Sequence, residues 1–383
     1  MRTMTVPYWR LSGFYLFYFA SLGAFLPYWS LYLASLGFTP AAIGQLMALM
    51  MLTKIISPNV WGWIADHTGR RMRIVQWGSL AAALAFAGVF FAQHFWWLAA
   101  VMMAFSFFWN ASLPQVEVTT LNHLGEQPHR YSAIRLWGSI GFIAAVAVLG
   151  PVLDRYGTPL LPSVLIALFS GIWLSSLWVP ERTIGELVTH GHAPLREVLS
   201  QRHVLALLAV CFLMQASHGP YYTFYSIYLQ DHGYTSSVIG QLWALGVIAE
   251  IGVFVVMPRL VTLFGLRTLL LSSLTLAALR WLLIGYFIDN MWVLIIAQVL
   301  HAATFGVYHG AAIQLIHRYF RGHHQGRGQA IYSSLSFGAG GAVGALYSGY
   351  TWNMGGGVIT FGSAALVCGA ALIFAWRGLK VDI

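Results

Sequence analysis

The sequence predicts an all-α membrane protein in which 12 transmembrane helices form two pseudo-symmetric six-helix bundles. Three observations predict this class: the composition, the placement of the basic residues and an internal repeat. Of the 383 residues, 58% are hydrophobic and 8% are charged, whereas a soluble protein carries about 25% charged residues. Because an apolar helix needs about 20 residues to cross the hydrocarbon core, the length provides for roughly 12 spans and no sizeable soluble domain.

Apolar runs of helical length mark the expected spans. The first of these runs is too long for a signal peptide and lacks a small-residue cleavage site, so we expect it to be retained. The longest polar segment lies at the middle of the chain, which predicts an N-terminal bundle at 1–180, a linker at 181–202 and a C-terminal bundle at 203–383. The expected spans are 10–34, 41–64, 73–93, 96–122, 131–152, 158–178, 203–229, 238–258, 267–287, 292–316, 328–350 and 357–376.

The basic residues predict the orientation of these spans. If both termini are cytoplasmic, 16 of the 20 Lys and Arg residues fall in cytoplasmic segments and one, Arg155, falls in an outer loop. This asymmetry follows the positive-inside rule and requires an even number of helices. We therefore expect a multi-pass protein of a bacterial inner membrane, with the net charge of +9 reflecting topology and no nucleic-acid partner.

An internal repeat relates the two halves of the chain. Residues 32–49 contain a pattern that returns at 228–245, including Ile43-Gly44-Gln45-Leu46 and Ile239-Gly240-Gln241-Leu242, at a constant offset of 196. The offset is close to half the chain and matches the first helix pair of one half to the first pair of the other. Parallel repeats of this kind build transporters whose substrate site lies between the repeats near the membrane midplane.

A loop motif follows the second expected span. The run Gly62-Trp63-Ile64-Ala65-Asp66-His67-Thr68-Gly69-Arg70-Arg71 resembles the G-x-x-x-D-R-x-G-R-R loop signature of the major facilitator superfamily, except at His67. We expect Gly62 to allow close helix approach, Gly69 to adopt a positive φ, and the charged side chains to form a conformational latch. The latch residues are Gly62, Asp66, Gly69, Arg70 and Arg71.

Charged side chains inside the expected spans predict the functional site. Each costs about 2.5–3.5 kcal/mol at a helix centre, so such residues face the bundle interior and mark substrate or proton paths. The repeat offset places Lys54 opposite Glu250, and we expect these two residues on opposite walls of a central cavity. The five intramembrane charges are Lys54, Glu117, Arg135, Glu250 and Arg280.

The spacing of Glu117 and Arg135 resembles helices 4 and 5 of the lactose permease family. In that family the corresponding Glu and Arg pair with each other and bind the sugar, and Phe142 stands where the family has a sugar-stacking Trp. Glu250, Arg280 and His301 match further substrate-linked and proton-linked positions. We therefore expect an ion pair between Glu117 and Arg135 at the cavity.

Other positions depart from lactose permease. Gln298 and Thr304 replace a Lys and the proton-carrying Glu, while Gln215 and His218 replace two Asp residues. These departures are similar to the phenylpropionate permease group, which the chain also resembles in Pro27-Tyr28-Trp29, His218-Gly219-Pro220-Tyr221-Tyr222 and His301-Ala302-Ala303-Thr304-Phe305. The resemblance implies proton symport of a small organic acid such as 3-phenylpropionate.

Aromatic and histidine residues complete the candidate site. Tyr28, Trp29, Phe142, Tyr221 and Tyr222 are the ring-stacking candidates, and Gln215 is added to the substrate-binding set. A carboxyl in an apolar site favours its protonated form, so Glu250 is the expected proton carrier, with His218, His301 and His309 as proton-handling neighbours.

These observations predict a monomeric proton-coupled symporter that works by alternating access and uses the proton gradient, with no cofactor and no metal. A sugar or nucleoside symporter is the alternative within transport. An intramembrane enzyme is disfavoured because His-Glu-x-x-His and Gly-x-Ser-x-Gly motifs and paired intramembrane aspartates do not occur. A passive channel is disfavoured by the repeat and the latch motif.

Overall fold

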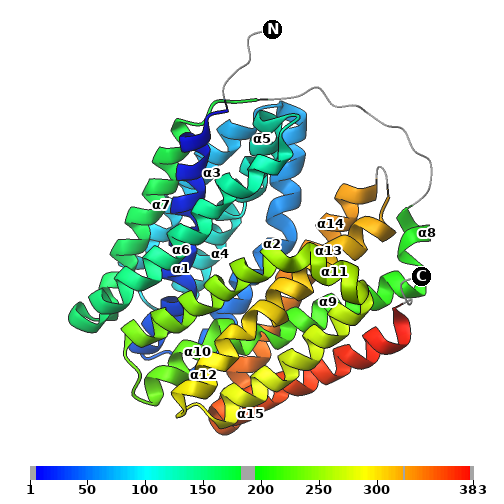
Figure 1. Ribbon diagram of the computed structural model, residues 1–383. Helices are drawn as coiled ribbons and strands as arrows, with labels where there is room; N and C mark the ends of the chain where they lie inside the picture. The colour runs from blue at the N-terminus through cyan, green and yellow to red at the C-terminus, as the bar shows by residue number, and fades with distance from the viewer. Residues whose placement is uncertain (1–5, 183–194, 322–323, 380–383) are drawn as a thin grey trace.

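The N-terminal half is a bundle of antiparallel helices. A computed structural model describes residues 6–182, 195–321 and 324–379, and every regular element within them is helical. In Figure 1 this half runs from blue to green. It comprises α1 (Tyr8–Ser35), α2 (Pro40–Thr68), α3 (Arg71–Phe86) with η1 (Ala87–Phe90), α4 (Phe95–Trp109), α5 (Ser112–Leu124), η2 (Pro128–Arg130), α6 (Tyr131–Tyr156), η3 (Thr158–Leu160) and α7 (Leu161–Leu177).

The C-terminal half contains more interruptions. Two π-helical segments, η4 and η6, lie within its spans, and the short helix α8 lies inside the expected linker. Residues 183–194 of that linker are outside the described residues. The elements are α8 (Leu195–Leu199), α9 (Arg202–Ser217), α10 (Gly219–Asp231), α11 (Ser236–Tyr286), α12 (Met291–Val299), η4 (Ala302–Val307), α13 (Tyr308–Tyr319), α14 (Gln325–Ser333), η6 (Ser334–Gly340) and α15 (Gly341–Gly378).

The number of spans agrees with the sequence prediction. Within the described residues, 10 helical stretches are long and apolar enough to cross a membrane. The stretch Ser236–Tyr286 breaks at Gly265, and Gln325–Gly378 breaks at Gly355 and Gly356, where the backbone leaves helical geometry. Counting both sides of these two breaks gives 12 segments. The expected all-α membrane class is confirmed, and the expected count of 12 spans is consistent with the described residues.

The repeat extends to the way in which helices begin. Thr39 caps α2 by accepting a hydrogen bond from the Ala42 amide at 3.3 Å, and Thr235 caps α11 by accepting one from Val238 at 3.4 Å. A threonine hydroxyl satisfies one of the amides that the first helical turn leaves without an intrahelical partner. The two caps are 196 residues apart, so the second helix of each half begins in the same way.

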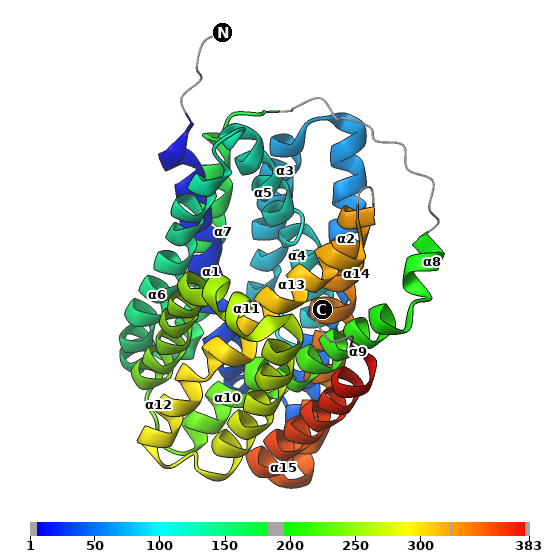
Figure 2. The same cartoon turned by 45° about the vertical axis from the view of Figure 1, so that its right-hand side comes forward.

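Two equivalent glycines bring the halves together. A Cβ on Gly44 would lie 2.7 Å from the Ala345 carbonyl oxygen, and a Cβ on Gly240 would lie 2.5 Å from that of Val146. Any larger residue would therefore separate α2 from α15 and α11 from α6. Figures 1 and 2 show that the halves diverge from this contact toward the end that carries α8. We call the end where they meet the closed end.

Asp154 strengthens the closed end by capping a helix of the other half. Its carboxylate accepts hydrogen bonds from the Ser236 amide at 2.6 Å, the Ser237 amide at 3.0 Å and the Ser237 hydroxyl. Ser236 is the first residue of α11, so the carboxylate faces the positive end of that helix dipole. The Tyr28 hydroxyl adds a bond to the Ser236 carbonyl at 3.1 Å.

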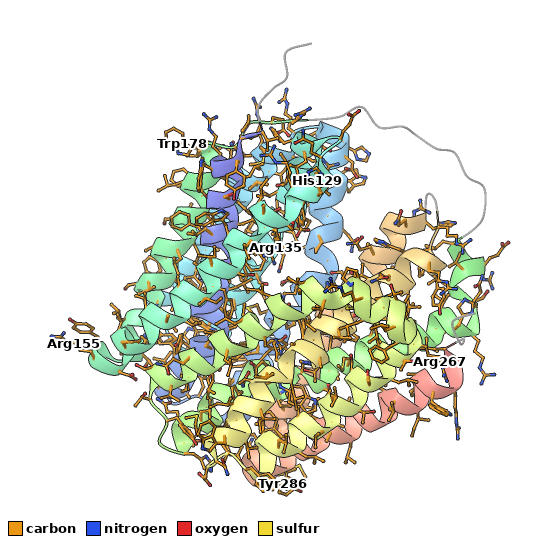
Figure 3. The ribbon with its side chains drawn as sticks, viewed as in Figure 1. His129, Arg135, Arg155, Trp178, Arg267 and Tyr286 are labelled. Atoms are coloured by element: carbon orange, nitrogen blue, oxygen red, sulfur yellow. The ribbon has the colours of Figure 1, made fainter. Side chains whose placement is uncertain are left out.

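We predict that Asp154→Ala loosens the closed end, because it removes the acceptor of three hydrogen bonds between the halves. Spin labels at Tyr156 and Tyr286, which are 63% and 59% exposed, report this separation by electron–electron resonance; Figure 3 shows Arg155 and Tyr286 at this end. A longer-distance population is expected. The control Asp289→Asn should leave the distances unchanged, and an unchanged distribution in Asp154→Ala would contradict the prediction.

Candidate functional site

Lys54 is an intramembrane cation without a partner. It lies on α2 and is half-buried, and among the described residues it has neither a hydrogen bond nor an ion pair. Its neighbour Thr53 faces into the N-terminal half, where its hydroxyl lies 2.7 Å from that of Ser106. Its other neighbour Ile55 packs against Gly338 of the opposite half. Lys54 is thus carried at the boundary between the halves.

Arg135 is the second available cation, and it does not make the expected ion pair. Figure 3 places it on α6 near the middle of the molecule. In the described part of the chain it has no hydrogen bond, and no ion pair joins it to Glu117. Instead, its guanidinium lies over the Phe19 ring, with the Cζ atom 3.7 Å from the ring centroid.

Glu117 takes a neutral partner. The Tyr131 hydroxyl donates a hydrogen bond of 3.3 Å to its carboxylate. Arg135 still interacts electrostatically with Glu117 and with Glu250 of the other half. The prediction of an ion pair is therefore wrong in this conformation, because aromatic contact with Phe19 takes the place of the carboxylate.

Glu250 pairs with a histidine of its own half. Its carboxylate lies 3.8 Å from His301 Nε2. From His301, stacked rings continue along the helix to Phe305 and His309, with centroid distances of 5.4 Å and 5.9 Å. His309 Nδ1 then lies 2.9 Å from the Tyr332 hydroxyl. Contacts thus connect Glu250 with His301 and, through Phe305, with His309; the role of these residues in handling protons stays a prediction.

Arg280 has several hydrogen-bond partners in its own half, unlike Lys54 and Arg135. It is fully buried, and it donates hydrogen bonds to the Ala297 carbonyl at 2.7 Å, Thr304 at 3.3 Å and Gln298 at 3.5 Å. Tyr221 and Trp281 cover the guanidinium, with ring centroids 4.3 Å and 4.7 Å away. Since each of its three nitrogen atoms donates a hydrogen bond within the C-terminal half, Arg280 helps to hold this half together.

Several buried polar atoms lie in the C-terminal half. Gln215 Nε2, His218 Nε2, Gln298 Nε2 and His301 Nδ1 are buried and lack hydrogen-bond partners among the described residues. His218 Nδ1 lies 2.8 Å from the Met214 carbonyl; because a carbonyl only accepts, Nδ1 carries the proton and Nε2 is the acceptor in the neutral ring. These atoms are free to form hydrogen bonds with the polar groups of a bound ligand.

The ring-stacking candidates separate into different environments. Trp29 is fully buried among aromatic residues of the N-terminal half, stacked on Phe25 at 5.1 Å, and Tyr28 belongs to the closed end. Tyr221 covers Arg280, and Phe142 is buried beside Gly23. Tyr222 is half-buried. Trp29 and Tyr28 are thus structural in this conformation, because their rings contact protein on all sides.

The loop motif after α2 forms some of the charged contacts that we expected of a conformational latch. Arg71 donates to Asp66 at 2.5 Å and to Gln115 of α5 at 2.7 Å, and Gly69 ends α2 with a φ of +64°. All of these residues belong to the N-terminal half. A Cβ on Gly62 would meet no atom within 4 Å, so the close approach expected there is absent. Arg70 forms no ion pair within the described residues.

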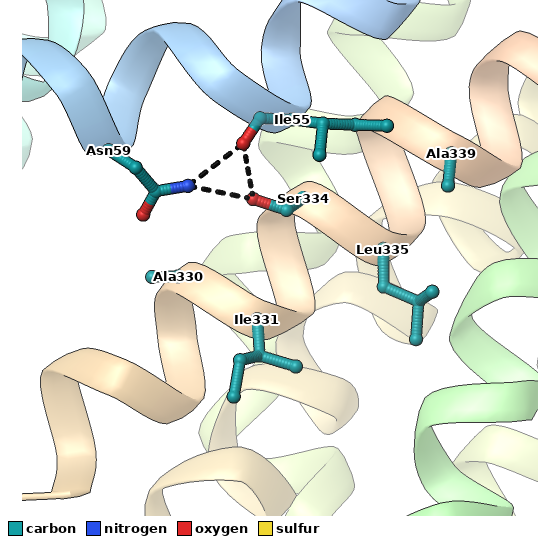
Figure 4. Close-up of a pocket in the computed structure, with 7 residues that line it drawn as sticks. All are labelled: Ile55, Asn59, Ala330, Ile331, Ser334, Leu335 and Ala339. Carbon is teal, nitrogen blue, oxygen red and sulfur yellow. Dashed lines mark hydrogen bonds between the residues drawn. The ribbon is translucent and has the colours of Figure 1, made fainter.

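A pocket lies between the halves one turn beyond Lys54. Figure 4 shows that it lies between α2 and the segment α14–η6, which line it with Ile55, Asn59, Ala330, Ile331, Ser334, Leu335 and Ala339. The Asn59 amide donates to the Ile55 carbonyl at 2.8 Å and to the Ser334 hydroxyl at 3.4 Å. Ser334 begins the π-helical segment η6. This contact joins the two halves at an irregular helix turn.

Sequence reasoning missed several residues of the site. Phe19 carried no signal because its partner Arg135 lies on another helix, and Asn59, Ser334 and Asp154 are ordinary polar residues in the sequence. Tyr131 could have been found, because it is four residues before Arg135 and therefore lies on the same helix face.

Two helical bundles that meet at one end are typical of a membrane transporter, and so are charges at their boundary that have no ion-pair partner among the described residues. The model of the MFS_1 like family matches residues 8–363, and the chain belongs to this family of the major facilitator superfamily. The match establishes transmembrane transport as its activity class. It also confirms the resemblance found in the loop motif.

Relatives of several kinds are similar over nearly the whole chain. A probable 3-phenylpropionic acid transporter of Escherichia coli is 30% identical over 364 residues, which cover 91% of this chain and 92% of that protein. Maltose permease of Geobacillus stearothermophilus is 27% identical over 92% of this chain and 91% of its own length. A mutant of the nucleoside transporter NupG has the same fold, with a TM-score of 0.85 at 16% identity, covering 96% of this chain and 98% of NupG.

We predict that replacing Arg280 and replacing Lys54 have different effects on thermal stability. Arg280→Met should lower the melting temperature in detergent by roughly 5 °C or more, because it leaves several buried acceptors unpaired. Lys54→Met should leave the melting temperature within about 2 °C of the original or raise it, since it removes a half-buried charge without a partner. Intrinsic-fluorescence melting measures both. Similar losses in the two variants would mean that Lys54 has a structural role as well.

Proposed function

We propose that this protein is a proton-coupled symporter of an aromatic carboxylate such as 3-phenylpropionate, working by alternating access. The observation that carries the proposal is the pair of available cations. Lys54 and Arg135 lie within an apolar bundle without hydrogen-bond or ion-pair partners among the described residues. Since such charges are costly in a membrane, an anionic ligand is the simplest partner for them.

The surroundings of the two cations support an aromatic ligand. Phe19 lies over Arg135, and Tyr15 lies 5.9 Å from the same guanidinium. Aromatic rings and a positive charge together suit a molecule with an apolar ring and a carboxylate. The E. coli relative described as a probable 3-phenylpropionic acid transporter is consistent with this ligand class.

Glu250 is proposed to carry the coupled proton. Thr304 stands where the lactose permease family has its proton-carrying Glu, but a threonine hydroxyl does not titrate as a carboxyl does. Its hydroxyl accepts a hydrogen bond from Arg280. Glu250 is the acid of the C-terminal half that contacts a histidine, and it interacts with Arg135 across the boundary. Protonation of Glu250 would free Arg135 from that interaction and so link the proton to binding of an anion.

The alternative, a sugar or nucleoside symporter, is favoured by one observation. The amide nitrogens of Gln215 and Gln298 are buried without partners, and such donors suit the hydroxyl and carbonyl groups of neutral ligands. A thermal-shift screen of 3-phenylpropionate, maltose and uridine decides between the two, since a ligand stabilises the folded state that binds it. In both cases we propose a bacterial inner-membrane location with cytoplasmic termini.

We predict that Lys54→Met and Arg135→Gln each weaken 3-phenylpropionate binding by about 10-fold or more, because a charged hydrogen bond contributes roughly 1.5–3 kcal/mol. Thermal-shift titration measures the affinity, and counterflow of labelled substrate in proteoliposomes measures carrier function. The control Arg155→Gln removes an exposed cation outside the site and should bind normally. Unchanged affinity in both site variants would reject the carboxylate proposal.

We predict that Glu250→Gln abolishes accumulation driven by a pH difference and preserves exchange of substrate, because exchange requires no net proton movement. Proteoliposomes with an imposed pH gradient measure accumulation, and preloaded vesicles measure exchange. Glu126→Gln, which alters an exposed loop acid, is the control and should accumulate substrate. If Glu250→Gln still concentrates substrate, the proton site lies at Glu117 or at the histidines.

A further inference from the structure

Phe19 and Arg135 form a stacked pair between two helices. Phe19 lies on α1 and Arg135 on α6, and both side chains are half-buried. The Arg135 Cζ atom is 3.7 Å from the Phe19 ring centroid, a distance at which the ring attracts the cation strongly. A ring held against a guanidinium restricts its motion without using any of its N–H donors.

Gly138 provides the space for this pair. It lies three residues beyond Arg135, on the same face of α6. A Cβ at this position would lie 2.6 Å from Phe19 Cδ2 and 2.7 Å from Arg135 Nη1. Any residue other than glycine would therefore push the ring or the guanidinium out of place. The Phe19 ring and the Arg135 guanidinium therefore pack directly against the surface of α6 at Gly138.

Arg135 differs from Arg280 in the hydrogen-bond donors that it has left. Arg280 is also stacked on aromatic rings, but its donors bind Ala297, Thr304 and Gln298. Arg135 contacts the Phe19 ring and donates no hydrogen bond within the described residues, so its N–H donors remain for another acceptor. Because a free arginine side chain loses considerable rotamer freedom on binding, a guanidinium that is already oriented binds an anion more tightly.

We propose that Phe19 is a positioning residue that, with Gly138, holds the Arg135 guanidinium in the orientation needed to bind a carboxylate through two parallel hydrogen bonds. The inference rests on the proposed function for the identity of the ligand. The orientation of Arg135 does not depend on it. Two parallel N–H bonds to one carboxylate are the geometry for which a planar guanidinium is suited.

The test compares four proteins. Phe19→Leu removes the ring, Phe19→Tyr keeps it, and Phe17→Leu is the matched control on the same helix, where Phe17 packs against Gly171 of α7 instead. Binding of 3-phenylpropionate is expected to weaken by about 2- to 30-fold in Phe19→Leu, the range that corresponds to one cation–π contact. Phe19→Tyr and Phe17→Leu should bind as the original protein does.

A second measurement reports on Arg135 without any ligand. Phenylglyoxal modifies accessible guanidinium groups, and peptide mapping by mass spectrometry gives the rate at Arg135 separately from other arginines. The rate is expected to rise by about twofold or more in Phe19→Leu, because the ring no longer restrains the side chain. Phe19→Tyr should restore the original rate, and Phe17→Leu should not change it.

The two measurements separate the possible failures. If 3-phenylpropionate does not bind the original protein, the proposed function is wrong, and the modification rate alone decides whether Phe19 positions Arg135. If Phe19→Leu weakens binding with an unchanged rate at Arg135, Phe19 contacts the ligand directly and the positioning role is overturned. An unchanged rate together with unchanged binding overturns it as well.

Discussion

The cost of placing charge in a membrane governs the interior of this protein. Each charged side chain must find compensation within the bundle, because hydrocarbon offers none. Arg280 is compensated by three hydrogen bonds and two rings. Arg135 is compensated partly by Phe19, and Lys54 has no partner among the described residues. The number of partners around each cation thus distinguishes Arg280, which stabilises the fold, from Arg135 and Lys54, which have donors left for a ligand.

The same constraint explains why the two halves differ in character. The C-terminal half contains the hydrogen-bonded Arg280, the buried amides and the histidines of the candidate site, and it also contains the two π-helical segments η4 and η6. Such segments often occur at functional sites because they alter the direction of side chains without ending the helix. The N-terminal half instead carries the two available cations. Arg135 of the N-terminal half therefore lies near enough to the acid–histidine pair of the other half to interact electrostatically with Glu250.

Contact between the halves depends on small residues and on one carboxylate. Gly44 and Gly240 allow backbone approach at equivalent positions of the repeat, but the bonds that accompany them differ. On one side Asp154 caps α11 with charge-assisted bonds, while on the other Gln45 donates to the Tyr350 hydroxyl at 2.9 Å. Asp154 and Tyr350 are separated by the repeat offset of 196. At the closed end the two close backbone contacts are thus related by the repeat, whereas the side-chain hydrogen bonds beside them differ.

The sequence by itself determined the fold class, the span count and the set of intramembrane charges, because hydropathy, charge asymmetry and the 196-residue offset are properties of the linear chain. It located the latch motif and the acid–histidine group of Glu250 and His301 for the same reason. Only the tertiary structure decided which charges are available, since Phe19 reaches Arg135 from another helix and Thr304 and Gln298 converge on Arg280 from a neighbouring span. It likewise decided that Trp29 is a core residue and that Tyr28 closes the boundary between the halves. Partnership between side chains on different helices depends on helix rotation and packing, which a single sequence does not specify.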